Sequence, residues 1–220
     1  LYVMIRNNCM TTFDVNGLWE EINDSDNSIP ERRIYRKSSS KDTKKDLADK
    51  IGLEVSEFDK WAIILKGKVD DPCEVSVPNV IYVVDLTSIP TWNSWQWGEE
   101  RVLRNEGYRT VELNDPTADE IKNIFSGKNI FGVVIIGHGD SDFKGSVIGA
   151  DLRRVDSGSV RATYKLGALK LVACYTKTRE SDWRSLVAQH GYFYPGNLGR
   201  LFAFEATFLH HGITNGKYKK

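Results

Sequence analysis

The sequence lacks both a long apolar run and a net charge. No stretch approaches the roughly 18 to 20 apolar residues that a transmembrane helix requires, and the first residues do not form a signal peptide. Thirty Lys and Arg side chains balance thirty Asp and Glu side chains among 220 residues, so no net field points to nucleic acid or to an anionic membrane. The sequence therefore predicts a soluble protein, cytoplasmic rather than secreted, with neither nucleic acid nor membrane as a partner.

Cysteine is scarce, and metal-ligand spacing is absent. The three cysteines, Cys9, Cys73 and Cys174, are odd in number and far apart, which argues against a disulfide framework and leaves at least one free thiol. There is no C-x-x-C pair, and His210 and His211 are adjacent, so on regular structure they diverge. We therefore expect no metal site and no cofactor.

The first third of the chain predicts a lead-in followed by a small helical module. Residues 1–29 carry turn residues and scattered acids without a sustained period, which indicates an extended segment. The start at Leu1 rather than Met fits a piece of a longer protein, such as a self-releasing protease or toxin module. Apolar residues at about helical spacing between residues 30 and 66 predict two short helices that break at Gly52. They include Leu47, Ile51, Val55, Phe58 and Ile63.

The segment "LADKIGLEVSEF" within this module, followed by a tryptophan, resembles the helical part of a lysin motif. The resemblance implies a role on glycan chains, and a purely packing role is the alternative. Proline-punctuated residues 67–78 are predicted to be a connector.

Residues 79–220 predict an α/β domain, with a mostly parallel sheet and flanking helices. Short apolar runs predict strands at 80–86, 109–114, 129–137 and 168–174, with a last strand near 201–205. Helical patterns occur at 98–108, 115–128 and 179–191, the second capped by Asp115, and residues 143–165 are typical of a hairpin. Strands separated by helices imply a parallel sheet, which places ligands beyond the carboxyl ends of its strands.

His138 and Cys174 both stand at such strand ends, each beside a small residue. Taken singly, a cysteine closing an apolar strand is ordinarily a core residue, and a histidine before a loop is an ordinary polar residue. Together they suggest chemistry, because a thiol with a pKa near 8.5 is only about 3% thiolate at neutral pH, and a nearby imidazole increases that reactive fraction. The backbone N–H groups of Gly139 and Cys174 could stabilise the oxyanion of an acyl transfer.

The segment "VVIIGHGD", followed 36 residues after its histidine by "LKLVACYT", resembles the His-Gly and Ala-Cys signatures of the caspase-like cysteine peptidases. This clan includes caspases, legumain, gingipains, clostripain and separase, and the resemblance covers about residues 79–208. It implies an endopeptidase with Cys174 as nucleophile, His138 as general acid/base, and Gly139 and Cys174 as the oxyanion hole. Nothing matches the longer caspase sequence around the nucleophile, so the gingipain, clostripain and legumain branches, and a bacterial source, fit better than a true caspase.

The same resemblance suggests where the side chain before the cleaved bond is bound. In this family that pocket is built from the end of the first strand, the position two before the nucleophile and a late loop, which here correspond to Asp85, Val172 and Glu205. A carboxylate at the end of an apolar strand is costly to desolvate unless it meets a cation. We therefore expect an Arg or Lys in the protein or peptide substrate, with Asp85 as first partner and Glu205 as second. An internal salt bridge from Asp85 to Arg101 or Arg104 is the alternative.

Other enzyme classes fit less well. Papain-like peptidases place cysteine early and histidine late, serine hydrolases need a G-x-S-x-G elbow, and a phosphate loop needs G-x-x-x-x-G-K-[ST]. A non-catalytic caspase-like or glycan-binding module with a buried cysteine stays open. Trp92, Trp95 and Trp97 could line a cleft or be buried under neighbouring loops.

Overall fold

The computed structural model describes residues 19–22, 31–86, 100–105, 107–127, 129–140, 142–162 and 164–193. These residues form two units, one ending at Pro78 and the other beginning at Asn79. The expectations for Trp92, Trp95 and Trp97, and for a strand near 201–205 that contains Glu205, lie outside the described residues.

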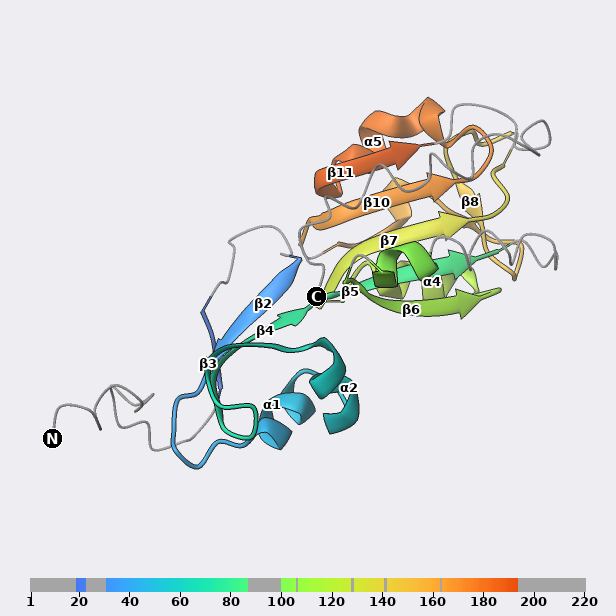
Figure 1. The fold of residues 1–220 in the computed structure, drawn as a ribbon. Coiled ribbons are helices and arrows are strands. Elements are labelled where there is room, and N and C mark those ends of the chain that lie inside the picture. The colour runs from blue at the N-terminus through green and yellow to red at the C-terminus, as the bar shows by residue number, and fades with distance from the viewer. Residues whose placement is uncertain are drawn as a thin grey trace, which may run out of the picture. The chain divides into compact units, whose positions relative to one another are not determined.

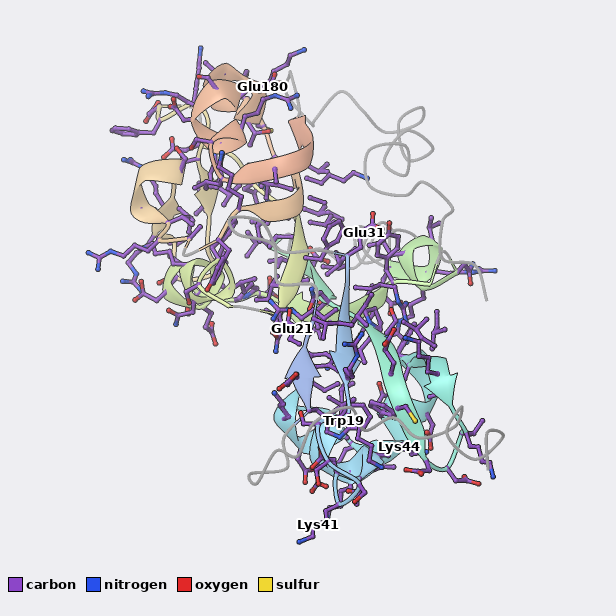
Figure 2. The ribbon with its side chains drawn as sticks, turned by 90° about the vertical axis from the view of Figure 1, so that its left-hand side faces the viewer. Trp19, Glu21, Glu31, Lys41, Lys44 and Glu180 are labelled. Atoms are coloured by element: carbon purple, nitrogen blue, oxygen red, sulfur yellow. The ribbon has the colours of Figure 1, made fainter. Side chains whose placement is uncertain are left out.

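The first unit is a four-stranded antiparallel sheet with two helices packed on it. The strands are ordered β1 (Glu20–Glu21), β2 (Arg32–Arg36), β4 (Pro72–Pro78) and β3 (Ile63–Gly67), and the helices are α1 (Lys44–Lys50) and α2 (Val55–Trp61). Trp19 is fully buried in its core, and the indole Nε1 donates a hydrogen bond to the Thr43 carbonyl at 2.9 Å. Figure 2 labels Trp19 among the side chains of this unit. The two expected helices are present, but the unit is α+β rather than the helical module expected for residues 30–66.

The connector expected at residues 67–78 is wrong, because β4 is the strand that joins β2 to β3. Its two prolines stand at the first and last strand positions, Pro72 and Pro78, where a missing N–H disturbs the ladder least. Ile63, expected in a helix, instead begins β3, since the chain is already extended at Ala62. Cys73, also on β4, is disulfide-bonded, which the scattered cysteines did not predict.

The second unit contains a five-stranded parallel sheet, which confirms the α/β fold class. Its order is β11-β10-β7-β5-β6, and Figure 1 shows the five arrows side by side and pointing the same way. The strands are β5 (Val80–Asp85), β6 (Arg109–Asn114), β7 (Ile130–Ile136), β10 (Leu166–Val172) and β11 (Val187–Phe193). The strand predicted at 109–114 has the same bounds in the structure.

The two faces of this sheet are covered by different elements. On one face, α4 (Ala118–Ile124) and α5 (Glu180–Arg184) contribute Ile121, Ile124 and Trp183 to an apolar cluster with the sheet. On the other face, Leu103 from the helical residues 100–105 packs, together with Tyr108, against alternate residues of β5, β7 and β10. No helix in the described part of the chain is long and apolar enough to cross a membrane.

The expected hairpin between residues 143 and 165 is present, whereas two helix predictions need correction. Strands β8 (Val147–Ile148) and β9 (Arg154–Val155) pair antiparallel, and a short 3-10 helix, η2 (Ser157–Ser159), follows. Helix α4 is capped by Thr117 rather than by Asp115, with Thr117 and Glu120 in a capping box. The helix expected at 179–191 ends at Arg184, and β11 follows it, because this segment pairs in parallel with β10.

Replacing Thr117 by Ala should destabilise this unit by about 1 kcal/mol, because the side chain that accepts the Glu120 N–H is lost. Thr117→Ser keeps the hydroxyl and should stay within about 0.5 kcal/mol of wild type. Urea unfolding followed by circular dichroism measures both. Equal stability of the Ala and Ser variants would show that the cap contributes nothing.

Candidate active site

Three neighbouring strands of the parallel sheet end at the same level. Asp85 at the end of β5 pairs in register with Ile136 at the end of β7, and Ile136 pairs with Val172 at the end of β10. The Gly137 N–H continues the ladder to the Val172 carbonyl at 3.1 Å. His138 and Cys174 each follow two residues after these paired strand ends, so their loops begin side by side.

The backbone of Gly139 lies directly against the backbone of Cys174. A Cβ added to Gly139 would overlap the Cys174 carbonyl oxygen and lie 2.8 Å from both the carbonyl carbon and the amide nitrogen of Cys174. Real Cβ atoms essentially never approach backbone atoms so closely, so no other residue fits here without a backbone shift. The glycine after His138 is therefore what allows the two loops to touch.

The Cys174 loop turns sharply and is held by a buried threonine. Tyr175 has a left-handed backbone conformation, with φ of 60°, which is uncommon for a residue with a side chain. The Thr176 hydroxyl donates to the carbonyls of Leu171 at 3.1 Å and Ala173 at 3.0 Å, and η3 (Thr176–Arg179) begins there. Cys174 itself is a free thiol and is partly buried, so it is sheltered without being sealed from solvent.

The His138 loop is held by the β8–β9 hairpin. The His138 carbonyl accepts the Ile148 N–H at 3.1 Å, and Gly139 stands opposite Val147. In this type of antiparallel pair the N–H groups of the two opposed residues point away from each other. The Gly139 N–H is thus directed away from the hairpin, while the His138 side chain is exposed to solvent.

Asp85 lies at the same sheet edge and is almost completely buried. It is 3% exposed, and strand alternation places its side chain on the sheet face that carries Val83 and Val172. Of the two expected counter-ions, Arg104 pairs with Glu100 and donates to Thr110 at 2.9 Å. Arg104 is therefore accounted for by contacts other than Asp85.

Lys170 is a charged residue of this face that the sequence analysis missed. It has no exposed area and shares its sheet face with Ala168 and Val172 on β10. A buried ammonium needs an anion or several acceptors. Lys170 therefore lies on the same sheet face as Asp85 and is a candidate partner for an internal ion pair with it.

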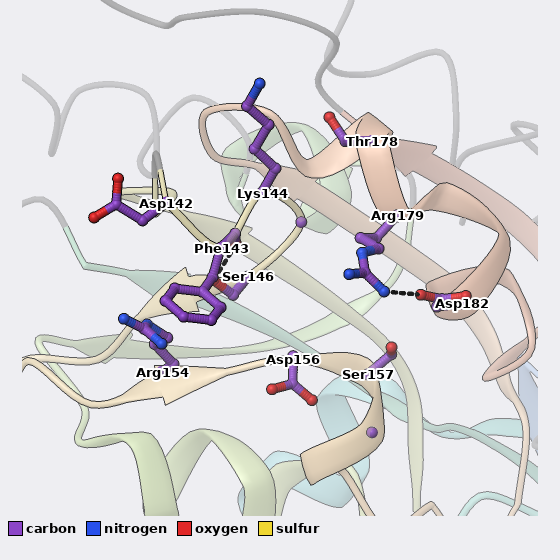
Figure 3. A pocket seen from close by; sticks show the side chains of 12 residues that line it. Asp142, Phe143, Lys144, Ser146, Arg154, Asp156, Ser157, Thr178, Arg179 and Asp182 are labelled. Carbon is purple, nitrogen blue, oxygen red and sulfur yellow. Dashed lines mark hydrogen bonds and ion pairs between the residues drawn. The ribbon is translucent and has the colours of Figure 1, made fainter.

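A pocket of about 890 Å³ opens between the segments that follow His138 and Cys174 (Figure 3). Its lining begins four residues after each of them, at Asp142 and Thr178. Figure 3 shows Phe143 and Arg154 on one side and the Arg179–Asp182 ion pair on the other. Its charged lining residues balance in sign: Asp142, Asp156 and Asp182 against Lys144, Arg154 and Arg179. The pocket borders the candidate site, but its lining includes neither His138 nor Cys174.

The structure thus gathers Cys174, His138, Gly139 and Asp85 at one edge, while Glu205 lies outside the described residues. Within those residues, no three His, Cys, Asp or Glu side chains come together in a way that could hold a metal ion. Sequence reasoning missed Thr176 and also Asp140, which organises the His138 loop. The signal for Asp140 was available, since an Asp at the start of a polar Asp-Ser-Asp run is typical of a side-chain-stabilised turn.

No family model matches the chain, and no curated protein matches it.

Replacing Gly139 by Ala should change the Cys174 loop, because the new methyl group overlaps backbone atoms that cannot rotate away. We expect a stability loss of about 1–3 kcal/mol and an altered rate of Cys174 alkylation by iodoacetamide, measured by peptide mass spectrometry. Gly158→Ala is the control, because there the methyl group would meet only an Asp156 carboxylate oxygen, at 3.3 Å. Wild-type stability and alkylation in Gly139→Ala would contradict the contact.

Proposed function

We propose that the unit beginning at Asn79 is a cysteine endopeptidase of the caspase-like kind, with Cys174 as nucleophile and His138 as general acid/base. The observation that carries the proposal is the backbone contact between Gly139 and Cys174. It lies in the loops that follow β7 and β10, which are adjacent and paired in register. It brings a histidine loop and a free thiol together in the chain order that the sequence signatures imply. The agreement between the order of the signatures and the position of the two loops supports the proposal.

The chemistry divides peptide hydrolysis into two steps. His138 takes the proton from the Cys174 thiol, and the thiolate sulfur attacks the carbonyl carbon of the substrate. The negative oxygen that develops is stabilised by the N–H groups of Gly139 and Cys174, each worth roughly 3–4 kcal/mol when well placed. The intermediate collapses as His138 gives its proton to the leaving amine. Water, deprotonated by His138, then hydrolyses the thioester, which releases the acid and restores the thiol.

The protein surroundings suit these roles. An exposed histidine can exchange protons with substrate and water, and a partly buried cysteine lies within reach of a bound chain. The Gly139 N–H, turned away from the hairpin, can be offered to a substrate oxygen. Because Gly139 has no side chain, a substrate carbonyl can approach its backbone closely.

One observation favours an alternative, a non-catalytic domain in which Cys174 has a structural role. Cys174 packs against the apolar cluster that includes Val172 and Ile136, as a cysteine with a purely structural role would. In that case the domain would be non-catalytic, a caspase-like or glycan-binding module. The rival predicts that changes at Cys174 affect stability and that changes at His138 affect nothing.

Cys174→Ala and Cys174→Ser should each reduce peptide cleavage by more than about 1,000-fold, because the nucleophile is lost. His138→Gln should reduce it similarly, because both proton transfers are lost. The measurement is mass spectrometry of peptides released from a whole proteome, which reports activity and preference together. Thermal unfolding of all three variants should stay within about 1 kcal/mol of wild type. Retained cleavage by Cys174→Ala, or a large stability loss without an activity change, would support the structural rival.

Cleavage should occur after Arg or Lys, because Asp85 places a buried carboxylate at the edge of the site. Asp85→Asn should lower kcat/KM for an Arg peptide by about 10- to 100-fold, the value of a charge-assisted hydrogen bond. Fluorogenic peptides ending in Arg, Lys, Asp, Asn or Leu test the preference. Asp119→Asn, at an exposed carboxylate on α4, is the matched control and should not alter it.

Preference for Asp peptides would contradict the proposed cleavage after Arg or Lys. An Asp85→Asn variant that cleaves the Arg peptide at the wild-type rate would contradict the role of Asp85. Lys170→Met tests the internal ion pair. If Lys170 neutralises Asp85, the two variants should destabilise the domain, and the double variant should cost less than the sum of the single ones.

A further inference from the structure

We propose that Asp140 and Arg154 are positioning residues that hold the His138 loop in place for the reaction. This inference rests on the proposed function, and it assigns roles to two residues outside the Cys174–His138 pair. Its basis is a set of contacts that links the loop containing His138 to both strands of the β8–β9 hairpin.

The first part of that set is a turn built on the Asp140 carboxylate. Its Oδ1 accepts the N–H of Asp142 at 2.8 Å and the N–H of Phe143 at 3.1 Å. The Asp140 side chain is only 12% exposed. These backbone hydrogen bonds, with Asp142 the strongest, lower the pKa of Asp140, and Arg154 lowers it further. The carboxylate therefore stays charged across the neutral range.

The second part is Arg154 on β9. Its Nε donates to the other Asp140 oxygen, Oδ2, and its guanidinium stacks 3.4 Å from the centre of the Phe143 ring. Figure 3 shows this stacked pair at the side of the pocket. Arg154 thus contacts both the first residue of the turn, Asp140, and the last, Phe143.

The third part links Arg154 to the His138 backbone through β8. Arg154 pairs across the hairpin with Ile148, and the Ile148 N–H donates to the His138 carbonyl. Asp140 is two residues from His138, so His138 lies inside a loop fixed at its carbonyl by β8 and at its far side by β9. Neither Asp140 nor Arg154 needs to touch the substrate for this effect.

Such fixing matters because the imidazole is exposed to solvent. A general base must lie within about 2.6–3.2 Å of the proton that it moves, and a misplacement of about 1 Å can cost about 100-fold in rate. Releasing the loop should therefore slow the chemical step more than it weakens binding.

The main variants are Arg154→Met, which keeps an unbranched side chain without the guanidinium, and Asp140→Ala, which removes the carboxylate that binds both the turn and Arg154. Each should lower kcat about 10- to 100-fold with KM changed less than about threefold, and each should alter the pH profile of kcat. Arg154→Lys should recover part of the loss. The control is Arg153→Met, at the neighbouring residue, whose guanidinium instead binds Asp119 at 2.7 Å and Asp151 at 2.5 Å. It should match wild type in kcat, KM and pH profile.

A second measurement separates this inference from the proposed function. The rate of Cys174 alkylation by iodoacetamide is followed against pH, with His138→Gln as reference, and needs no substrate. A changed profile in Arg154→Met and not in Arg153→Met supports the positioning role even if the wild type cleaves no peptide. Alkylation profiles of Arg154→Met and Asp140→Ala equal to that of Arg153→Met would overturn it, whether or not the protein is a peptidase.

Discussion

The parallel pairing of β7 with β10 is the constraint on which the candidate site depends. Small residues allow this pairing to be close: a Cβ on Gly132 of β7 would lie 3.1 Å from the Ala168 carbonyl of β10. Because the two strands run parallel and in register, their carboxyl ends emerge at one level, and Gly139 meets Cys174 there. A slip of one residue would also turn every core side chain of β10 to the opposite face. The same apolar packing that stabilises the sheet therefore fixes the relative height of the two loops.

The sheet face that carries Cys174 is unusual in burying charge as well as apolar surface. Asp85 and Lys170 are both almost inaccessible on that face, among Val83, Val134 and Ile136. Buried charges stabilise a fold poorly compared with well-packed apolar residues. Asp85 stands at the carboxyl end of β5, and Lys170 lies two residues before the end of β10. Their burial on one face is more easily explained by local electrostatics than by stability.

Strong local patterns predicted much of the second unit. The β6 strand was predicted with its observed bounds, because Tyr108 and Asp115 bracket a run of strand-forming residues. The placement of His138 and Cys174 at one edge of the sheet followed from the rule that parallel strands end together. In contrast, β11 was predicted as helix, since its stability comes from its pairing with β10 and not from its own periodicity. β4 was missed because its terminal prolines are also typical of linkers.

The residues that organise the site were harder to predict than those proposed to perform the chemistry. Thr176 and Asp140 bind backbone groups that lie close in sequence, and such contacts resemble ordinary turn chemistry until the fold places them beside a thiol and an imidazole. The contact from Arg154 to Asp140 spans 14 residues and depends on the hairpin between them. No periodic pattern in the sequence reports a contact of that kind.

The connection between the two central strands explains why the site is built from so few elements. Parallel neighbours need a crossover, most often a helix. Here the crossover from β7 to β10 contains the β8–β9 hairpin and η2, and the hairpin folds back to bind the His138 carbonyl before the chain continues to β10 and Cys174. One segment therefore both links the two strands and fastens the first loop. A cysteine used only for packing would not need the hairpin, because Cys174 packs against the apolar cluster that includes Val172 and Ile136, and the hairpin is not part of that cluster.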